Sequence, residues 1–333
     1  MEQKEMHFPT LQQIICDYSM PELRKLAKHL KISGYSHLRK PDLTAAVSQG
    51  ILSSKLMEPM VIVQDDRTYA LFLRAVESGM PVKGVAKSDT FFPDVFSYLF
   101  FPSLDDGRCY VPEDVRGACI RMLEDGLTEK RKRNWLMHRY ALAAVNLYGL
   151  IPAAELIDIF NKQNAKKTDQ EEMVRALSRF EVCGLGYHIW NWHIVDDGFA
   201  YNNFEDAKDL IRLCENKPRY VPGKKDFLRY SDIEYYEKTV YTQKMAQFLQ
   251  EEFQVSARTA SDMVCEIHQA CVIEAELSTY LKFLADFNII MTGDQTSRFF
   301  ALVMDIHNNA RLWSNKGYTP KELAATRDGL GNP

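Results

Sequence analysis

Six basic side chains and one tyrosine cluster near the N-terminus of the chain. They are Arg24, Lys25, Lys28, Lys31, Tyr35, Arg39 and Lys40. Residues 17–43 hold six bases and three acids, which is a local excess of three positive charges. Guanidinium and ammonium groups bind the phosphates of nucleic acids. We therefore expect this stretch to contact DNA or RNA.

Two short helices must position these side chains. Ser19 can cap the first helix, with Glu22 in the capping-box position three residues later. A Ser-Gly pair at residues 33–34 ends this helix, and Pro41 starts a second one. The pattern therefore predicts a helix, an extended link over residues 34–40, and a second helix.

The apolar residues of the same segment have the spacing of a miniature core. They recur at helical intervals and flank the link, and they are Leu23, Leu26, Leu30, Ile32, Leu38 and Leu43. If these side chains turn inward, the basic side chains must face solvent.

Residues 20–43 resemble the N-terminal domain of transcription termination factor Rho and, more broadly, the SAP-type helix–extension–helix module. The matching features are the ELRKLAK helix, the ISGYS link and the LRKPDL entry to the second helix. The resemblance implies contact with DNA or RNA. Some modules of this type dock proteins or act as structural caps, so that alternative stays open.

The rest of the chain looks less sharply familiar. Residues 146–152 and 159–161, with residues 308–313 and 317–323, resemble uncharacterised bacterial helical proteins, some of which end in a cysteine-rich SEC-C zinc motif. That motif is absent here, so no zinc site is carried over. This resemblance suggests a bacterial or phage source and supplies no activity.

The whole chain is close to electrical balance. Its 333 residues include 41 Lys+Arg and 45 Asp+Glu, for a net charge of −4. A protein that coats nucleic acid with its entire surface is usually basic, so any such contact must be local. The content of 46% apolar and 11% aromatic residues argues against long disorder and suits two or three domains.

Cysteine usage and hydropathy point to the cytoplasm. The seven cysteines are widely spaced without a CxxC pair, which favours reduced thiols over a disulfide framework. The first ten residues lack the apolar core of a signal peptide, and no run reaches the ~18 apolar residues of a membrane span. We therefore expect a cytoplasmic protein with no membrane partner.

Helical patterns recur along most of the chain, so the predicted fold class is mainly α, multi-helix, with a few short strands. We expect three domains, which are the module at 1–55, a small helical domain at 56–127 and a helical body at 128–333. In the second domain, helices at 66–78 and 91–101 precede a turn at 105–108, which is a winged-helix-like order.

Enzymatic signatures are weak throughout. Cys265, His268 and Cys271 are the best metal candidates by composition, but residues at i, i+3 and i+6 of a helix span too wide an arc to converge on one ion. The GxSxG, P-loop and HExxH motifs are absent from the sequence. We therefore expect no metal, no cofactor and no catalytic residue, although scattered catalytic residues leave an enzyme possible.

Three other segments could do chemistry or serve the fold. The basic run 130–133 at a predicted helix start could bind an anion or form a solvated, salt-bridged face. Residues 187–193 hold two Trp and two His, which suit base stacking or acid–base work but more often pack a strand. Residues 219–236 interleave bases with aromatics, which suits single-stranded nucleic acid or a loop clamped on a helical core.

The sequence thus predicts a non-enzymatic, nucleic-acid-associated protein whose N-terminal module contacts phosphates and whose helical body serves regulation or partner docking. The alternative is a protein–protein interaction factor of phage or host-defence type, with the module as a docking or structural cap. A hydrolase or nuclease built on His188 and His193 is a third reading. These patterns do not distinguish DNA from RNA, and they do not identify the oligomeric state or the protein partner.

Overall fold

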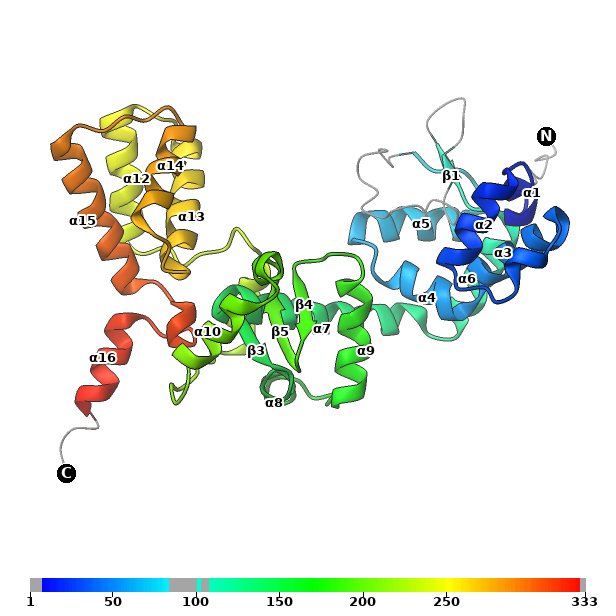
Figure 1. Cartoon of the computed structure of the whole chain (residues 1–333), viewed down its shortest axis with the longest axis horizontal. Helices are drawn as coiled ribbons and strands as arrows, with labels where there is room; N and C mark the ends of the chain where they lie inside the picture. The colour runs from blue at the N-terminus through cyan, green and yellow to red at the C-terminus, as the bar shows by residue number, and fades with distance from the viewer. Residues whose placement is uncertain (1–7, 84–100, 103–107, 330–333) are drawn as a thin grey trace. The chain divides into compact units, whose positions relative to one another are not determined.

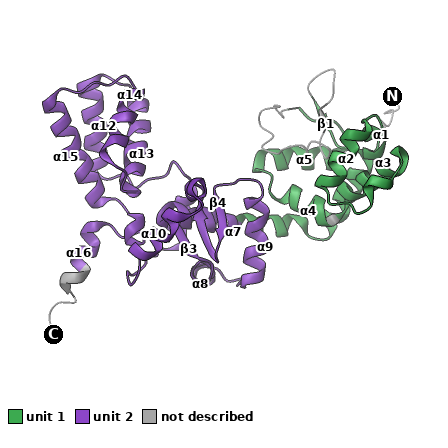
Figure 2. Cartoon of the chain, viewed as in Figure 1, with its two compact units in different colours: residues 1–135 green, residues 136–333 purple. Residues whose placement is uncertain are grey.

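The computed structural model describes residues 8–83, 101–102 and 108–329. The chain divides into two compact units, residues 1–135 and 136–333 (Figure 2). Helices dominate both units (Figure 1), which confirms the predicted mainly-α class. The predicted three-domain division, with boundaries after residues 55 and 127, stays a prediction.

Unit 1 is built from short helices. Its elements are α1 (Leu11–Ile15), α2 (Met20–His29), the 3₁₀ turn η1 (Tyr35–His37), α3 (Lys40–Leu52), α4 (Ser54–Ile62), α5 (Asp66–Ser78), β1 (Phe101–Pro102), β2 (Cys109–Tyr110) and α6 (Glu113–Glu124). Helix α3 lies against α1, α2, α4 and α6, so it forms the centre of the unit. Its buried side chains Leu43, Val47 and Ile51 belong to that core.

The second half of unit 1 matches the predicted winged-helix-like order in part. Helix α5 spans the predicted residues 66–78 and ends at Gly79, whose φ of +63° suits glycine. Strands β1 and β2 pair antiparallel, with Phe101 opposite Tyr110. The predicted helix at 91–101 is wrong at Phe101, which lies in β1, and residues 91–100 lie outside the described residues. The winged-helix-like order therefore stays a prediction.

Unit 2 combines a small sheet with many helices. Helix α7 (Leu127–Tyr148) leads into β3 (Leu150–Pro152), α8 (Ala153–Gln163), α9 (Gln170–Glu181), β4 (Tyr187–Trp190), β5 (His193–Asp196), η3 (Asp197–Asn202), α10 (Glu205–Leu213), α11 (Lys224–Phe227), η4 (Leu228–Ser231), α12 (Val240–Phe253), α13 (Ala257–Val272), α14 (Leu277–Asp286), α15 (Gly293–Asn309), η5 (Trp313–Asn315) and α16 (Pro320–Gly329).

The sheet of unit 2 has the antiparallel order β3-β5-β4. A two-residue turn, Asn191-Trp192, joins β4 to β5, and both residues have positive φ, +46° and +62°. Such a turn matches the twist of the paired strands, but its second position usually holds glycine. The sheet therefore places an exposed tryptophan at a backbone position that disfavours one.

The C-terminal helices of unit 2 form a bundle with its own core. Helix α12 packs on α13 and α15, and α14 packs on α13. The core includes Met245, Phe248, Met263, Ile267 and Phe299, all buried. No helix in the described ranges is both long enough and apolar enough to cross a membrane.

Candidate nucleic-acid interface

Helix α2 begins where the sequence predicts. The Ser19 backbone N–H donates to Glu22 Oε2 over 2.7 Å, and the Glu22 N–H donates back to Ser19 Oγ over 3.5 Å. This closed capping box satisfies the free donors at the helix start. The Ser19 hydroxyl and N–H bonds lower the pKa of Glu22, with a smaller contribution from Lys40.

The end of α2 is fixed by a lysine in an unusual conformation. The Ile32 N–H donates to Ala27 O over 2.9 Å, and the Lys31 N–H donates to Lys28 O over 3.1 Å. This is the Schellman arrangement, whose left-handed residue is usually glycine. Here it is Lys31, with φ of +55°. A charged side chain therefore stands at a position where glycine would fold at lower cost.

The link returns the chain so that α2 and α3 run side by side in the same direction. Lys40, at the start of α3, lies close enough to Glu22, at the start of α2, to influence its pKa. At the other end, Ile32 Cδ1 would lie 3.3 Å from a Cβ built on Gly50 of α3. The parallel pair agrees with the predicted order of two helices and a link. The predicted extended conformation of residues 34–40 is wrong, because Gly34 has φ of +71°, Tyr35–His37 form the 3₁₀ turn η1, and Lys40 already belongs to α3.

The predicted miniature core is correct for only half of its members. Leu23 and Leu43 are fully buried and Leu26 nearly so. Leu30, Ile32 and Leu38 are only half-buried. The reason is that α3 also packs on α1 and α6, so the module shares its core with the rest of unit 1.

All six predicted basic side chains are exposed. They are Arg24, Lys25, Lys28, Lys31, Arg39 and Lys40, whereas Tyr35, in η1, is half-buried. Arg24, Lys25 and Lys28 fall within about 100° of one another around α2, away from its buried leucines. Lys31 follows at the end of that helix, and Arg39 and Lys40 stand at the start of α3. The fold thus brings Arg24, Lys25 and Lys28 onto one face and leaves the other three at the ends of the helix pair.

The charge of these six residues is not neutralised locally. None of them forms an ion pair with a carboxylate in the described ranges of the chain, although Lys40 lies near Glu22. Helix α3 also begins with Arg39 as its N-cap and no side-chain cap bond. Free backbone N–H groups at a helix start favour anions, but in this first turn Pro41 has no N–H and Asp42 already supplies a carboxylate, so the contribution of the helix start is small beside that of the basic side chains.

The basic run 130–133 is different, and the predicted helix start is wrong. Helix α7 begins earlier, at Leu127, so the run lies in its first two turns. Arg131 is buried, donates to Gln64 O over 2.6 Å, and pairs with Asp66 at 2.8 Å. Lys130 pairs with Glu58 at 2.9 Å. Arg131 is therefore part of the fold of unit 1 rather than of a solvated face.

Residues 187–193 form the hairpin rather than a convergent site. Tyr187 is fully buried and its hydroxyl lies 3.0 Å from His138 Nδ1. His188 Nε2 lies 3.5 Å from Asp197 Oδ1, whereas His193 Nδ1 lies 2.8 Å from Asn191 O. The two hairpin imidazoles thus have different partners.

The aromatic and basic residues of 219–236 are largely used inside unit 2. Arg219 pairs with Glu155 at 2.7 Å and lies over the Tyr148 ring. Tyr230 is buried and donates to Glu237 over 2.8 Å. The segment therefore clamps the helical core, which is one of the two alternatives drawn from the sequence.

The cysteine-containing helix α13 does not gather metal ligands. Cys271 is buried and accepts from the Tyr280 hydroxyl over 3.4 Å, whereas Cys265 Sγ faces Glu234 O at 3.5 Å. Burial lowers the pKa of His268 to about 4. Across the residues described, no group of three or more His, Cys, Asp or Glu side chains is placed to hold a metal ion.

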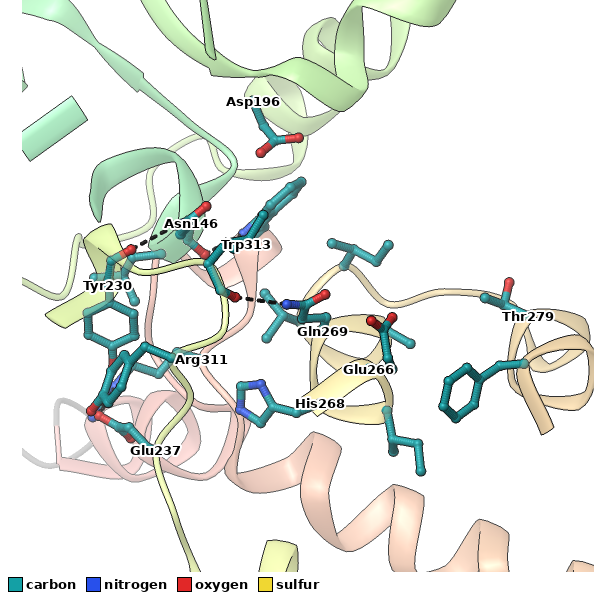
Figure 3. A pocket seen from close by; sticks show the side chains of 18 of the residues that line it. Asn146, Asp196, Tyr230, Glu237, Glu266, His268, Gln269, Thr279, Arg311 and Trp313 are labelled. Carbon is teal, nitrogen blue, oxygen red and sulfur yellow. Dashed lines mark hydrogen bonds and ion pairs between the residues drawn. The ribbon is translucent and has the colours of Figure 1, made fainter. Parts of the chain in front are cut away.

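Unit 2 contains a pocket that no sequence pattern indicated (Figure 3). Its volume is about 370 Å³. Asp196 lies on one side, Glu266 and His268 of α13 lie on another, and Trp313 stands between them. These residues are far apart in the sequence, so only the tertiary fold brings them together.

Arg311, which lines this pocket, is the centre of an ion network. Arg311 Nε donates to Glu237 Oε1 over 3.0 Å, and Arg311 Nη1 donates to Glu322 Oε2 over the same distance. The guanidinium also stacks 3.6 Å from the centre of the Tyr220 ring. Arg311 is therefore held by fold contacts, and Asp196 and Glu266 are the other two acidic residues of the lining.

Segments that resemble uncharacterised bacterial helical proteins, residues 146–152 with 308–313 and 317–323, pack on each other beside this pocket. The Trp313 indole N–H donates to Asn146 O over 3.0 Å. A Cβ on Gly149 would overlap the Trp313 ring, and one on Gly317 would crowd Tyr148. Both glycines have positive φ. The spacing of these motifs thus reflects close packing around Trp313.

Comparison with known proteins supports the N-terminal module alone. No curated protein and no solved structure gives a significant match to the chain. The family model of the Rho termination factor N-terminal domain matches residues 17–50. This range includes α2, η1 and all six exposed bases. Residues 17–50 are therefore a module of the Rho N-terminal type.

Proposed function

We propose that this protein is a non-enzymatic, nucleic-acid-associated factor. Its N-terminal module contacts the phosphates of DNA or RNA, and its second unit serves regulation or partner docking. The observation that carries the proposal is the set of six exposed basic residues on a module of the Rho N-terminal type. None of them forms an ion pair with a carboxylate among the residues that the structure describes, and the chain as a whole has a net charge of −4.

The contact follows from charge and helix geometry. Arg24, Lys25 and Lys28 present three positive groups along one face of α2. Arg39 and Lys40 add two more beside the free N–H groups of α3. Phosphate contacts of this kind position a nucleic acid without reading its bases, and each releases counterions. Binding should therefore fall steeply as salt rises.

The test is fluorescence anisotropy of the full chain with labelled single-stranded RNA, single-stranded DNA and duplex DNA over a salt series. The module variant replaces Arg24, Lys25, Lys28, Lys31, Arg39 and Lys40 by Gln. The matched control replaces two exposed arginines and four exposed lysines of unit 2, which are Arg212, Lys238, Lys244, Arg258, Lys282 and Lys321.

We expect the module variant to lose binding and the matched control to keep most of it, although both lose the same charge. Equal binding by the module variant and the wild-type protein would overturn the proposal. The probe that binds most tightly at a fixed salt concentration shows which of the three kinds of nucleic acid the protein prefers.

A second candidate function is protein docking, with the N-terminal module as a cap. The pocket beside Trp313 favours it, because exposed apolar side chains and carboxylates line a concave surface of unit 2. The two functions assign different roles to the module, so absence of nucleic-acid binding by the wild-type protein at low salt would favour the second function over the first.

A further inference from the structure

A second hollow of unit 2 adjoins the pocket beside Trp313. Its volume is about 680 Å³, and α10, η3 and the end of α13 line it. Asp196, Val272, Ile273 and Trp313 line both hollows. We call the two together the Trp313 groove, an elongated depression in which Ile273 and Trp313 stand at the junction.

Three large apolar side chains that line the Trp313 groove, which we call its floor, are exposed to solvent. Ile273 is 52% exposed, Leu213 is 54% exposed, and Ile233 is 70% exposed. Each is a large apolar side chain facing solvent within a concave surface, where burial by a partner would remove it from water. A partner that fills both hollows must extend across Ile273, which lies where the two hollows meet.

The rim of the Trp313 groove is acidic. Six carboxylates line the two hollows, against one guanidinium, that of Arg311; they are Asp196, Asp206, Asp209, Glu237, Glu266 and Glu274. His268 adds no charge near neutral pH, because burial lowers its pKa to about 4.

Within the described part of the chain, two of these carboxylates pair with a guanidinium. Arg311 holds Glu237 at 3.0 Å, and Arg212 holds Asp209 at 2.6 Å. Among the residues that the structure describes, the Asp206 carboxylate accepts from the Tyr201 hydroxyl and the Asp196 carboxylate from the Gly198 N–H. Glu274 faces His307 at 3.6 Å. Glu266 has no ion-pair partner among the residues that the structure describes. Because burial raises the pKa of Asp196, the unneutralised negative charge of the groove lies mainly on Asp206, Glu266 and Glu274, around an apolar floor.

We propose that the Trp313 groove docks a basic amphipathic segment of a protein partner. Apolar side chains of the segment would cover Ile273, Leu213 and Ile233, while its Lys and Arg side chains would face Asp206, Glu266 and Glu274. This is helix-in-groove recognition with electrostatic complementarity. The inference rests on the partner-docking part of the proposed function and is independent of nucleic-acid contact.

The probe is a labelled 18-residue peptide with Leu at one helical face and Lys at the other positions. Two comparison peptides carry Glu in place of Lys, or the same residues in an order that breaks the apolar face. Binding to the full chain is measured by anisotropy at two salt concentrations. We expect the basic amphipathic peptide to bind, and both comparison peptides to bind at least about tenfold more weakly.

Three variants locate the site. The rim variant carries Asp206→Asn, Glu266→Gln and Glu274→Gln, and the floor variant carries Leu213→Ser and Ile273→Ser. The control variant carries Glu251→Gln, Asp262→Asn and Asp286→Asn, three exposed acids outside the groove. All altered side chains are exposed, and thermal melting checks that each variant folds.

We expect the rim and floor variants to weaken peptide binding about tenfold and the control variant to leave it nearly unchanged. Equal peptide binding by all three variants, or equal binding of the Glu peptide, would overturn the proposal. Each variant is also tested with the nucleic acid. Normal nucleic-acid binding by the rim variant, with loss of peptide binding, separates this inference from the proposed role of the module.

Discussion

The N-terminal module and the Trp313 groove present opposite surfaces. The module displays six exposed bases from a segment of 17 consecutive residues, 24–40. The groove displays six carboxylates and an apolar floor, drawn from residues as distant as Asn146 and Trp313. A basic face suits a polyanion, whereas an acidic apolar groove suits a basic peptide. The two proposed partners therefore carry opposite charges and would contact different side chains.

The largest expected effect is seen when the module variant and the rim variant are each measured with both ligands, the nucleic acid and the basic peptide. The six-residue module variant should weaken nucleic-acid binding by at least about 100-fold near 0.1 M salt, because several phosphate contacts disappear together. Its peptide binding should be unchanged. The rim variant should show the reverse pattern.

Fluorescence anisotropy measures both affinities of each variant, for the nucleic acid and for the peptide, in the same buffer. If one variant weakens both ligands equally, the two surfaces are not independent, and the comparison fails.

Gly149→Ala should damage the groove and leave the module intact. Gly149 has φ of +72°, and an added Cβ would overlap the Trp313 ring that lies at the junction of the two hollows. We expect unit 2 to lose about 3 kcal/mol of unfolding free energy from strain and overpacking. Urea unfolding followed by tryptophan fluorescence measures the loss.

The matched control is Gly184→Ala, which has similar positive φ but no neighbouring heavy atom in contact range. It should cost roughly 1 kcal/mol, from backbone strain alone. Equal losses for both variants would show that close packing on Trp313 is not the cause.

Acid should destabilise unit 2 through His138. This histidine is buried against Phe180 and Tyr187, and burial lowers its pKa to about 3. The unfolded state takes up a proton near pH 6.5 and the folded state does not, so stability is complete above pH 6.5 and falls as the pH decreases toward 3. We expect a loss on the order of 2 kcal/mol by pH 5.

Urea midpoints measured from pH 7.5 to 5 check this dependence. In a His138→Gln variant the curve should be flatter, although the variant is less stable at pH 7.5. An unchanged slope would assign the acid sensitivity to other groups.

The smallest expected effect concerns Lys31, whose charge should favour nucleic-acid binding while its left-handed backbone conformation lowers the unfolding free energy of unit 1. Lys31→Gly should raise the unfolding free energy of unit 1 by about 0.5–1 kcal/mol, because glycine suits the left-handed conformation that Lys31 adopts. The same change should weaken nucleic-acid binding a few-fold by removing one phosphate contact.

Lys31→Gln is the matched variant, since it removes the charge and keeps the strained backbone. It should weaken binding equally without raising stability. A Lys31→Gly protein with unchanged affinity would remove Lys31 from the interface.

Local spacing was enough to predict the elements of the module. The Ser19 capping box and the exposure of the basic residues depend on neighbours within a few positions. The predicted helix end at Ser33-Gly34 is wrong, because α2 already ends at His29 with Lys31 in the left-handed cap position. The winged-helix-like order could be followed only in α5 and the β1–β2 pair. Arg131 was misjudged because its partners, Gln64 and Asp66, lie some 65 positions earlier in the chain.

The sequence by itself determined the mainly-α class, the Rho N-terminal type module and its exposed charge. These properties follow from periodicity, capping and charge within short windows. The tertiary structure alone decided which apolar residues of the module are fully buried, where the hairpin of unit 2 turns, and that the Trp313 groove exists. Each of these depends on which distant segments pack together, and a pattern within one segment carries no information about its packing partner.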